Sequence, residues 1–523
     1  MRWIRQLGGG AQGTTWLVER DGRRAVAKRL HPGADERARA RLMREAEVLG
    51  GLRHGHVPTL LGVEPDGFVM EAFAGDVADE AGPVDLAELL YGALRALAHA
   101  HARGVLHNDL SPANLLRDGR HVVLGDFGAA RTRGEDPHGA PGTRQMLPPE
   151  RTERFGDVGP WSDLFALARV AEHVVTTGWT PETRQWARWL QEPHVPDRAP
   201  SAHAALQALK PLLPAPPPRA RPAQTPWPSA LGLTRSLCVG RDAERARIAA
   251  ALHGPLPRRI TVSGPPGCGA STLARDAAEG LAEREGVPVL WATHGPGDGD
   301  GLVGMARRWF RVEDPRHPGA EATVRATLGR LGGMAAGQVG RLRRLLGGQG
   351  STDRRHETVL EWLALLPGPC VVVLDAPDAD TLAFVDRALA TSLRAVFVVV
   401  GGATGPTGDG DVVLGPLGRE ATRALLRQTL ALHRGLEERL LHHTDGHLLF
   451  ARQLLGEWAH RGLLVGRPQG YELAQPYWPD TLDALLSDRL VDRVAGERGP
   501  VAPELLELAS LMGPRVVPEV HEA

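Results

Sequence analysis

The chain has 523 residues, of which 42% are hydrophobic and 24% charged, a balance typical of folded globular domains rather than of disordered chains. At roughly 150 residues per domain, this length predicts three or four domains. The 61 basic and 62 acidic residues leave a formal charge of −1, so no overall electrostatic case exists for binding nucleic acid or a membrane surface.

The apolar runs and the cysteines exclude further classes. The longest apolar runs, Val371–Leu374 and Val396–Val400, are far shorter than the roughly 20 residues of a membrane-spanning helix. Residues Met1–Ile4 lead straight into a glycine-rich loop, unlike a cleaved signal peptide. Three scattered cysteines form neither a disulfide framework nor a metal set. We therefore expect a cytoplasmic protein.

Two residue types are rare. Lysine occurs only at Lys28 and Lys210, and asparagine only at Asn108 and Asn114. Arginine in place of lysine is typical of a GC-rich coding bias. Against that background, a retained lysine or asparagine indicates a position where chemistry needs it.

Composition and periodicity divide the chain into four parts. Residues 1–212 alternate short β-like runs with amphipathic helical stretches, and residues 213–235 are so rich in proline that we expect a semi-rigid, extended linker. Residues 236–430 alternate apolar runs with helical patterns, which predicts a parallel sheet flanked by helices. Residues 418–512 are mostly helical by period, and we assign residues 431–523 to a helical lid and a truncated winged-helix-like segment. The predicted strands of the sheet are Arg259–Ser263, Val287–Ala292, Val371–Asp375 and Ala395–Gly401.

The first motif is a glycine loop followed by a lysine. Gly8, Gly10 and Gly13 form G-x-G-x-x-G, which alone is a weak signal because glycine is abundant here. A short strand then ends at Lys28, and the next helical stretch carries Glu45. A lysine that binds the α- and β-phosphates of a nucleotide needs such an acidic partner to hold its ammonium group.

The second motif contains both asparagines of the chain. Residues 107–114 have the pattern H-x-D-x-x-x-x-N, in which Asp109 would receive a hydroxyl proton and Asn114 would hold a metal ion. Twelve residues later, Asp126 begins an Asp-Phe-Gly sequence after a strand, where an aspartate coordinates the Mg²⁺ that bridges the β- and γ-phosphates.

These landmarks, in this order, make residues 1–212 resemble a bacterial serine/threonine protein kinase. The resemblance implies a bilobal α+β fold, ATP and Mg²⁺ as cofactors, Asp109 as the catalytic base, and Asn114 and Asp126 as Mg²⁺ ligands. It further implies that Met70 is the gatekeeper and that Glu71 lies beside the adenine. Three other matches are Gly142–Glu150, the end of the activation segment; Ser162–Leu167, the start of the central helix; and Arg198, the partner of Glu150.

Two positions depart from the kinase pattern. The arginine expected before the catalytic aspartate is Asn108, so we expect no dependence on a phosphorylated activation loop. The lysine expected two residues after the aspartate is Ser111, which predicts slower transfer. The His-Asn-Asp form also resembles small-molecule kinases, although these lack the Gly142–Glu150 segment. A further alternative is a catalytically weak signalling scaffold.

A second glycine loop follows the strand at Arg259–Ser263. It has the P-loop form G-x-x-x-x-G-K-[ST], whose backbone N–H groups bind phosphate at the start of a helix. Alanine replaces the lysine of this pattern, and the acid that commonly follows the Walker B aspartate is absent. The residues of this degenerate site are Gly264, Gly267, Gly269, Ala270, Ser271, Thr272 and Asp375.

The C-terminal half resembles the STAND class of P-loop NTPases, which are related to AAA+ proteins. The matching segments are Val239–Glu244, Leu414–Leu417 and Thr444–Phe450, with Leu448 where the family has its sensor proline. The resemblance implies a P-loop NTPase sheet with a helical lid and, at Glu504–Arg515, the start of a winged helix. The missing residues predict a fold that does not hydrolyse ATP, with weak nucleotide binding through the backbone N–H groups as the alternative. The proline-rich hinge and the family's habit of oligomerising imply that this fold regulates the kinase.

Together these observations predict an ATP-dependent serine/threonine protein kinase of bacterial signalling with a regulatory C-terminal module. The family's habit of oligomerising implies that this module assembles the protein into a homo-oligomer. The protein substrate stays unassigned, and neither nucleic acid nor membrane is expected as a partner.

Overall fold

The computed structural model describes most of the chain. The described residues are 1–9, 13–20, 22–78, 83–131, 146–152, 158–217, 224–294, 301–312, 314–317, 319–332, 336–401 and 411–487. Gly10, residues 142–145 of the expected activation segment and the expected winged-helix start at Glu504–Arg515 lie outside these ranges.

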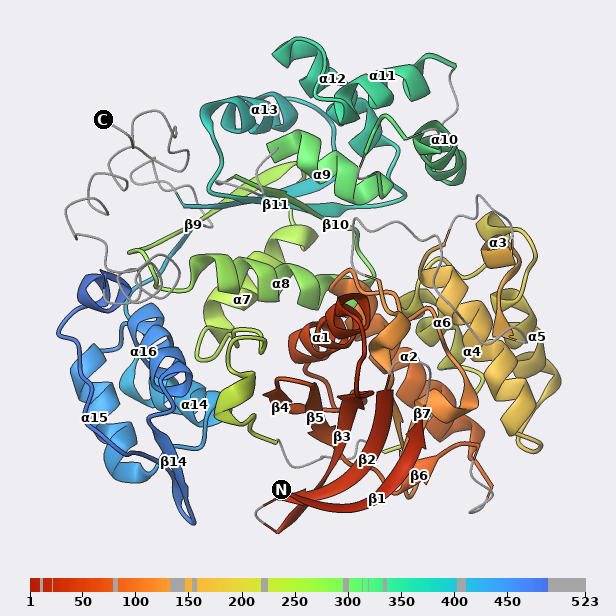
Figure 1. Ribbon diagram of the computed structural model, residues 1–523. Coiled ribbons are helices and arrows are strands. Elements are labelled where there is room, and N and C mark those ends of the chain that lie inside the picture. Colours follow the sequence, from red (N-terminus) through yellow and green to blue (C-terminus); the bar gives the residue numbers. More distant parts are fainter. Residues whose placement is uncertain are drawn as a thin grey trace.

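The chain begins with a five-stranded antiparallel sheet in the order β1-β2-β3-β5-β4. A single long helix, α1 (Glu36–Gly51), packs against this sheet and begins at Asp35, whose carboxylate accepts a hydrogen bond from the Ala38 N–H at 2.7 Å. Sheet and helix form the first lobe (Figure 1). The strands are β1 (Arg2–Gly9), β2 (Gly13–Arg20), β3 (Arg23–Leu30), β4 (Leu60–Glu64) and β5 (Gly67–Glu71).

The second lobe is mainly helical and surrounds α2 (Leu86–Ala102). This helix carries apolar residues on most of its circumference, and Leu90, Leu94 and Leu97 are completely buried. Its other elements are β6 (Gly75–Asp76), β7 (Leu115–Asp118), β8 (His121–Leu124), α3 (Pro149–Thr152), α4 (Pro160–Val174), α5 (Pro181–Leu190) and α6 (Ala202–Leu209). One continuous apolar core joins the two lobes.

A buried ion pair ties α3 to the loop before α6. The Arg198 guanidinium donates to both carboxylate oxygens of Glu150, at 2.9 and 3.1 Å, as the sequence predicts. Ser162 at the start of α4 also donates to Glu150, at 2.7 Å. Both partners are almost fully buried, so each charge depends on the other.

Residues 224–236, which contain the second described stretch of the predicted linker, are here named the linker segment. It packs on the first lobe instead of extending through solvent, because its tryptophan finds an apolar site there. The backbone N–H of Trp227 donates to the Leu61 carbonyl at 2.5 Å. The indole ring of Trp227 covers Gly62, where a Cβ would lie 2.3 Å from the ring. The Arg20 guanidinium lies 4.2 Å from the centre of the same ring.

Residues 237–487 form the C-terminal module, built on a parallel sheet in the order β10-β11-β12-β9-β13. All four predicted strands are present. Apolar cores lie on both faces of this sheet, one under α8 and the other under helices α9 to α13 (Figure 1). The strands are β9 (Arg258–Ser263), β10 (Val289–Thr293), β11 (Cys370–Asp375), β12 (Ala395–Val400) and β13 (Val412–Val413).

Helices flank the sheet and then complete the module. Those around the sheet are α7 (Asp242–Ala250), α8 (Ala270–Glu285), α9 (Gly301–Phe310), α10 (Ala320–Arg330), α11 (Ala336–Leu346), α12 (Thr352–Ala364) and α13 (Ala379–Leu389). The final group comprises α14 (Arg419–Thr429), α15 (Arg434–Thr444), α16 (Leu448–His460) and the hairpin β14–β15 (Leu464–Arg467 and Gly470–Leu473). This group begins at α14, ahead of the predicted boundary at residue 430, because Leu426 and Leu430 share its core.

Helix α8 of the C-terminal module lies against α2 of the second lobe. Glu283 accepts hydrogen bonds from His99 and Arg103, both at 3.0 Å. One turn earlier, Glu279 pairs with Arg235 of the linker segment at 2.6 Å. The two halves of the chain therefore meet through an acidic helix face and basic side chains.

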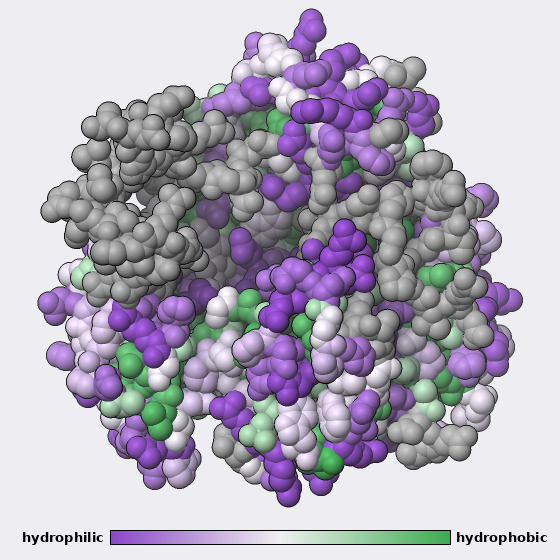
Figure 2. All heavy atoms as spheres, in the orientation of Figure 1, coloured by the Kyte–Doolittle hydropathy of each residue, from purple (hydrophilic) through white to green (hydrophobic). Residues whose placement is uncertain are grey.

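Where Figure 2 colours the surface by hydropathy, it is mostly hydrophilic, and apolar side chains occur there in small separate groups. Within the described ranges, no helix is both long enough and apolar enough to cross a bilayer.

The Glu150–Arg198 pair yields a stability prediction. We expect Arg198→Ala to lower the free energy of unfolding by about 3–5 kcal/mol, because Glu150 would stay buried without its counter-charge. The first urea transition, followed by circular dichroism, measures this change. The exposed Arg188→Ala variant on α5 is the control, and an equal effect of both variants would contradict the assigned role of the pair.

Candidate active site

Three predicted residues meet between the lobes. The Lys28 Nζ lies 2.6 Å from the Glu45 Oε1 and 2.8 Å from the Asp126 Oδ1. Lys28 comes from β3, Glu45 from α1 and Asp126 from the loop after β8. The ammonium group thus links the sheet, the helix and the second lobe at one point.

The charges of this group perturb one another. Burial opposes the charge on Lys28, but Glu45 and Asp126 outweigh it and raise its pKa above the ordinary value. Burial raises the pKa of Glu45 to about 6, with Lys28 only partly offsetting it. Burial also disfavours the charge on Asp126, but the nearby Lys28 outweighs burial and lowers the pKa of Asp126 overall. Lys28 is thus firmly cationic, while Glu45 titrates near pH 6.

A buried carboxylate fixes the loop that carries Asp109. Asp163 at the start of α4 accepts the backbone N–H groups of His107 at 2.9 Å and Asn108 at 2.8 Å. It also bonds His101 at 2.9 Å, a contact for which the sequence has no spacing signal. Asn108 has a φ of +67°, a left-handed conformation that asparagine tolerates better than most side chains, which suits the residue found here.

Asp109 and Asn114 are joined across this loop. The Asn114 side-chain amide donates to the Asp109 carbonyl oxygen at 2.7 Å, and a short 3₁₀ turn from Pro112 to Asn114 sets the spacing. This hydrogen bond holds the backbone of Asp109 in place, while the Asp109 side chain is partly exposed. The loop therefore presents one accessible carboxylate on a rigid support.

Asp126 is held in a left-handed conformation with φ of +57°. Its carboxylate accepts the Gly128 N–H at 3.3 Å, and Phe127 is buried against the His107 ring, with centroids 4.9 Å apart. Asp126 contributes carboxylate oxygens and Asn114 an amide oxygen, the ligand types that Mg²⁺ prefers. These two side chains therefore suit the predicted Mg²⁺ site.

Two of the three predicted nucleotide-loop glycines are described: Gly8 lies near the end of β1, and Gly13 begins β2. Gly13 must lack a side chain, because a Cβ there would lie 2.1 Å from the Arg29 carbonyl oxygen. Gly8 has open space around it, and its role stays a prediction.

The predicted adenine-side residues end β5. Met70 is buried in the shared core, and its role as gatekeeper stays a prediction. The Glu71 carboxylate accepts hydrogen bonds from the Thr59 N–H and from Gln224, both at 3.3 Å. Gln224 belongs to the linker segment, and the sequence offered no signal for this contact.

The second glycine loop, residues 264–272, is named the P-loop-like segment. It connects β9 to α8 as predicted, with Gly267 and Gly269 at φ of +80° and +93°. The Ser271 hydroxyl donates to Asp375 at the end of β11, at 2.9 Å. Ala270, the first residue of α8, occupies the position where the P-loop pattern has its lysine. The Leu449 side chain of α16 lies against it, only 2.8 Å from where a Cβ of Gly267 would be.

Comparison with known proteins identifies the first part of the chain. The family model "Protein kinase domain" matches residues 1–185. These residues form a protein kinase domain. The match fits the bilobal fold and the Lys28–Glu45 pair described above.

Curated relatives of this part are bacterial kinases. The chain is 35% identical over 173 residues to the DNA damage-responsive serine/threonine-protein kinase RqkA of Deinococcus radiodurans, covering 29% of this chain and 26% of that protein. It is 32% identical over 208 residues to serine/threonine-protein kinase PkaB of Streptomyces coelicolor, covering 34% and 48%. The chain therefore spans between a quarter and a half of the length of these relatives.

The pKa of Glu45 predicts an acid limit on phosphoryl transfer. As the pH falls through about 6, Glu45 takes up a proton and no longer holds Lys28 by charge, so kcat/KM should fall. In Glu45→Gln the rate should be roughly 10- to 100-fold lower at neutral pH and should lose this acid limb. A pH profile of both proteins measures this, and an unchanged limb in the variant would contradict the assignment.

Proposed function

We propose that the chain is an ATP- and Mg²⁺-dependent serine/threonine protein kinase of bacterial signalling. The observation that carries this proposal is the position of the Lys28 ammonium, 2.6 Å from the Glu45 carboxylate and 2.8 Å from the Asp126 carboxylate, as a nucleotide-positioning site requires. The kinase-domain match and the named serine/threonine kinases among the relatives support it.

In this proposal each residue has a physical task. Bound ATP with Mg²⁺ supplies the γ-phosphoryl group and the charge that neutralises it during transfer. Lys28 orients the α- and β-phosphates, and Glu45 keeps its ammonium in place. Asn114 and Asp126 hold the metal, while Asp109 positions the substrate hydroxyl and accepts its proton.

The second candidate is a catalytically weak scaffold. It is favoured by Ser111, which stands where kinases have a lysine that neutralises the transferring phosphate, and which is buried in the loop. The chain retains all five charged or metal-binding residues of the kinase pattern, which argues for the kinase instead. These residues are Lys28, Glu45, Asp109, Asn114 and Asp126. We therefore expect slow transfer rather than none.

We further propose that the C-terminal module is a STAND-like regulatory module that does not hydrolyse ATP. Ala270 in place of the P-loop lysine supports this, since no ammonium is available from that position. A homo-oligomer formed through the module would raise the local concentration of kinase domains and so their self-phosphorylation.

Transfer of labelled γ-phosphate tests the kinase proposal. Lys28→Met and Asp126→Ala should each lower transfer at least about 100-fold, because both remove groups that position ATP. Lys210→Met, which alters the exposed second lysine of the chain, is the matched control and should retain the full rate. No label from the wild-type protein, with ATP still bound, would favour the scaffold.

The P-loop-like segment has its own test. Ser271→Ala removes the hydroxyl bonded to Asp375 and should leave kinase transfer within about twofold of wild type, because the segment does not supply the reacting ATP. ATP hydrolysis without a protein acceptor, measured as phosphate release in the Asp126→Ala protein, should be undetectable. Phosphate release that disappears in Ser271→Ala would contradict the proposed loss of hydrolysis.

A further inference from the structure

The acidic face of α8 joins the C-terminal module to the second lobe of the kinase domain. Besides its hydrogen bond to Glu283, Arg103 at the end of α2 lies 3.6 Å from Glu279, one turn earlier on α8. The Glu283 carbonyl oxygen accepts a hydrogen bond from His203 of α6 at 3.3 Å. One face of α8 therefore holds two helices of the second lobe, α2 and α6.

A second contact to this lobe lies away from α8. The Arg330 guanidinium of α10 lies 4.5 Å from the centre of the Trp161 ring, at the start of α4. The same end of α4 carries Asp163, which fixes the loop of Asp109. The module thus touches the part of the second lobe that supports the catalytic loop.

Glu283 is charged in the contact between α8 and α2. Burial raises its pKa, but the hydrogen bond from His99 and the charge of Arg103 outweigh burial and lower this pKa to about 2. The contact therefore depends on a carboxylate charge, which Glu283→Gln removes with little change of shape.

The same module holds the first lobe through the linker segment. The Ser229 hydroxyl accepts a hydrogen bond from the Val63 N–H of β4 at 3.1 Å, next to the site of Trp227. The following two residues belong to different cores. Ala230 is buried in the core of the kinase domain, and Leu231 is buried in the core of α14, α15 and α16. The linker segment thus joins β4 to the final helical group by continuous packing.

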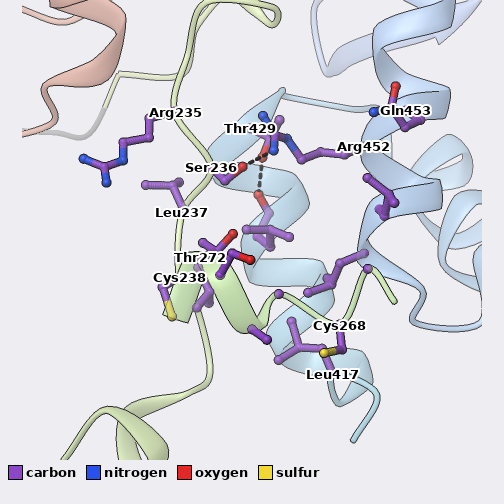
Figure 3. A pocket seen from close by; sticks show the side chains of 18 of the residues that line it. Arg235, Ser236, Leu237, Cys238, Cys268, Thr272, Leu417, Thr429, Arg452 and Gln453 are labelled. Carbon is purple, nitrogen blue, oxygen red and sulfur yellow. Dashed lines mark hydrogen bonds between the residues drawn. The ribbon is translucent and has the colours of Figure 1, made fainter. Parts of the chain in front are cut away.

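Figure 3 shows the last residues of the linker segment beside α16. Ser236 is turned toward Arg452 of α16, whose guanidinium donates a hydrogen bond to the Ser236 hydroxyl. The preceding residue, Arg235, donates its backbone N–H to the Gly50 carbonyl of α1 at 3.0 Å, while its guanidinium pairs with Glu279. The segment is therefore bound to the first lobe and to the module at the same time.

The module contacts both lobes, and the candidate ATP site lies between the lobes. In kinases, the lobes close around the nucleotide by a change in their relative angle. A body that is bound to both lobes restrains this angle. In the restrained arrangement the Lys28 ammonium reaches Glu45 of the first lobe and Asp126 of the second, so the site is assembled.

We propose that the C-terminal module is an intramolecular brace that holds the two kinase lobes in the arrangement that assembles the ATP site. Arg103, Glu279 and Glu283 form its contact with the second lobe and are positioning residues, since they act through the lobes. The brace acts within one chain, and it rests on the proposed kinase function. A binding-competent arrangement that is only partly populated weakens apparent affinity by that fraction. Loosening the brace should therefore weaken ATP binding and leave transfer at saturating ATP little changed.

Calorimetric titration of the full-length protein tests the brace. The probe is the non-hydrolysable ATP analogue AMP-PNP with Mg²⁺, and binding at the kinase site is the part that Lys28→Met removes. Glu283→Gln and Arg103→Gln should each weaken this binding about 5-fold or more. The matched control is Glu285→Gln, which removes a charge from the same turn of α8. Its partner, at 3.5 Å, is His253 of the module itself, so binding should not change.

The variant that carries both substitutions separates one contact from two unrelated losses. If Arg103 and Glu283 act together, the double variant should bind AMP-PNP no more weakly than Arg103→Gln alone. Losses that multiply would contradict the brace, and so would undiminished binding in both single variants.

Steady-state transfer of labelled γ-phosphate separates positioning from general damage to the fold. In Glu283→Gln, the KM for ATP should rise about 5-fold while kcat stays within about twofold, because saturating ATP closes the lobes again. A fall in kcat with an unchanged KM would overturn the proposal. A wild-type protein that binds AMP-PNP but transfers no phosphate would instead contradict the kinase proposal, so the two failures are distinguishable.

Discussion

The ion pair between Lys28 and Glu45 is the interaction on which the rest of the kinase domain depends. A buried ammonium group lowers the stability of the fold unless an opposite charge lies close to it. Here the carboxylates of Glu45 and Asp126, which come from different elements, both lie close to the Lys28 ammonium. The pair fixes α1 against the sheet, and the contact with Asp126 fixes the second lobe against both. A change in the position of α1 therefore changes the site itself.

The last turn of the same helix is held by a part of the chain almost 200 residues away. The linker segment covers β4 with Trp227 and bonds the last turn of α1 through Arg235. Arg235 is in turn paired with Glu279 of α8. Helix α1 thus carries Glu45 on the same C-terminal half that the linker segment contacts at Gly50.

Most of the kinase domain could be predicted from the sequence because its chemistry lies in short motifs with fixed spacing. Lys28, Asp109, Asn114 and Asp126 are each marked by their neighbours, and the rarity of lysine and asparagine sharpened the signal. The strands of the parallel sheet were also predictable, since their apolar runs are buried on both faces.

Contacts between distant segments could not be predicted in this way. The proline-rich composition of residues 213–235 predicted an extended chain, but composition does not reveal that Trp227 has a site on Gly62. The hydrogen bond from Gln224 to Glu71 likewise depends on tertiary packing, which leaves no local pattern. The core that Leu426 and Leu430 share with the final helical group is a tertiary contact of the same kind, because their helical period does not name their partners.

The central claim is that Lys28 and Glu45 act as one unit in phosphoryl transfer. A double-mutant cycle with Lys28→Met, Glu45→Gln and the double variant tests it most directly, using single-turnover transfer of labelled γ-phosphate at pH 7.5. The account predicts that the double variant is no slower than Lys28→Met alone, because Glu45 acts only through Lys28. Rate losses that multiply would show two independent roles and would contradict the account.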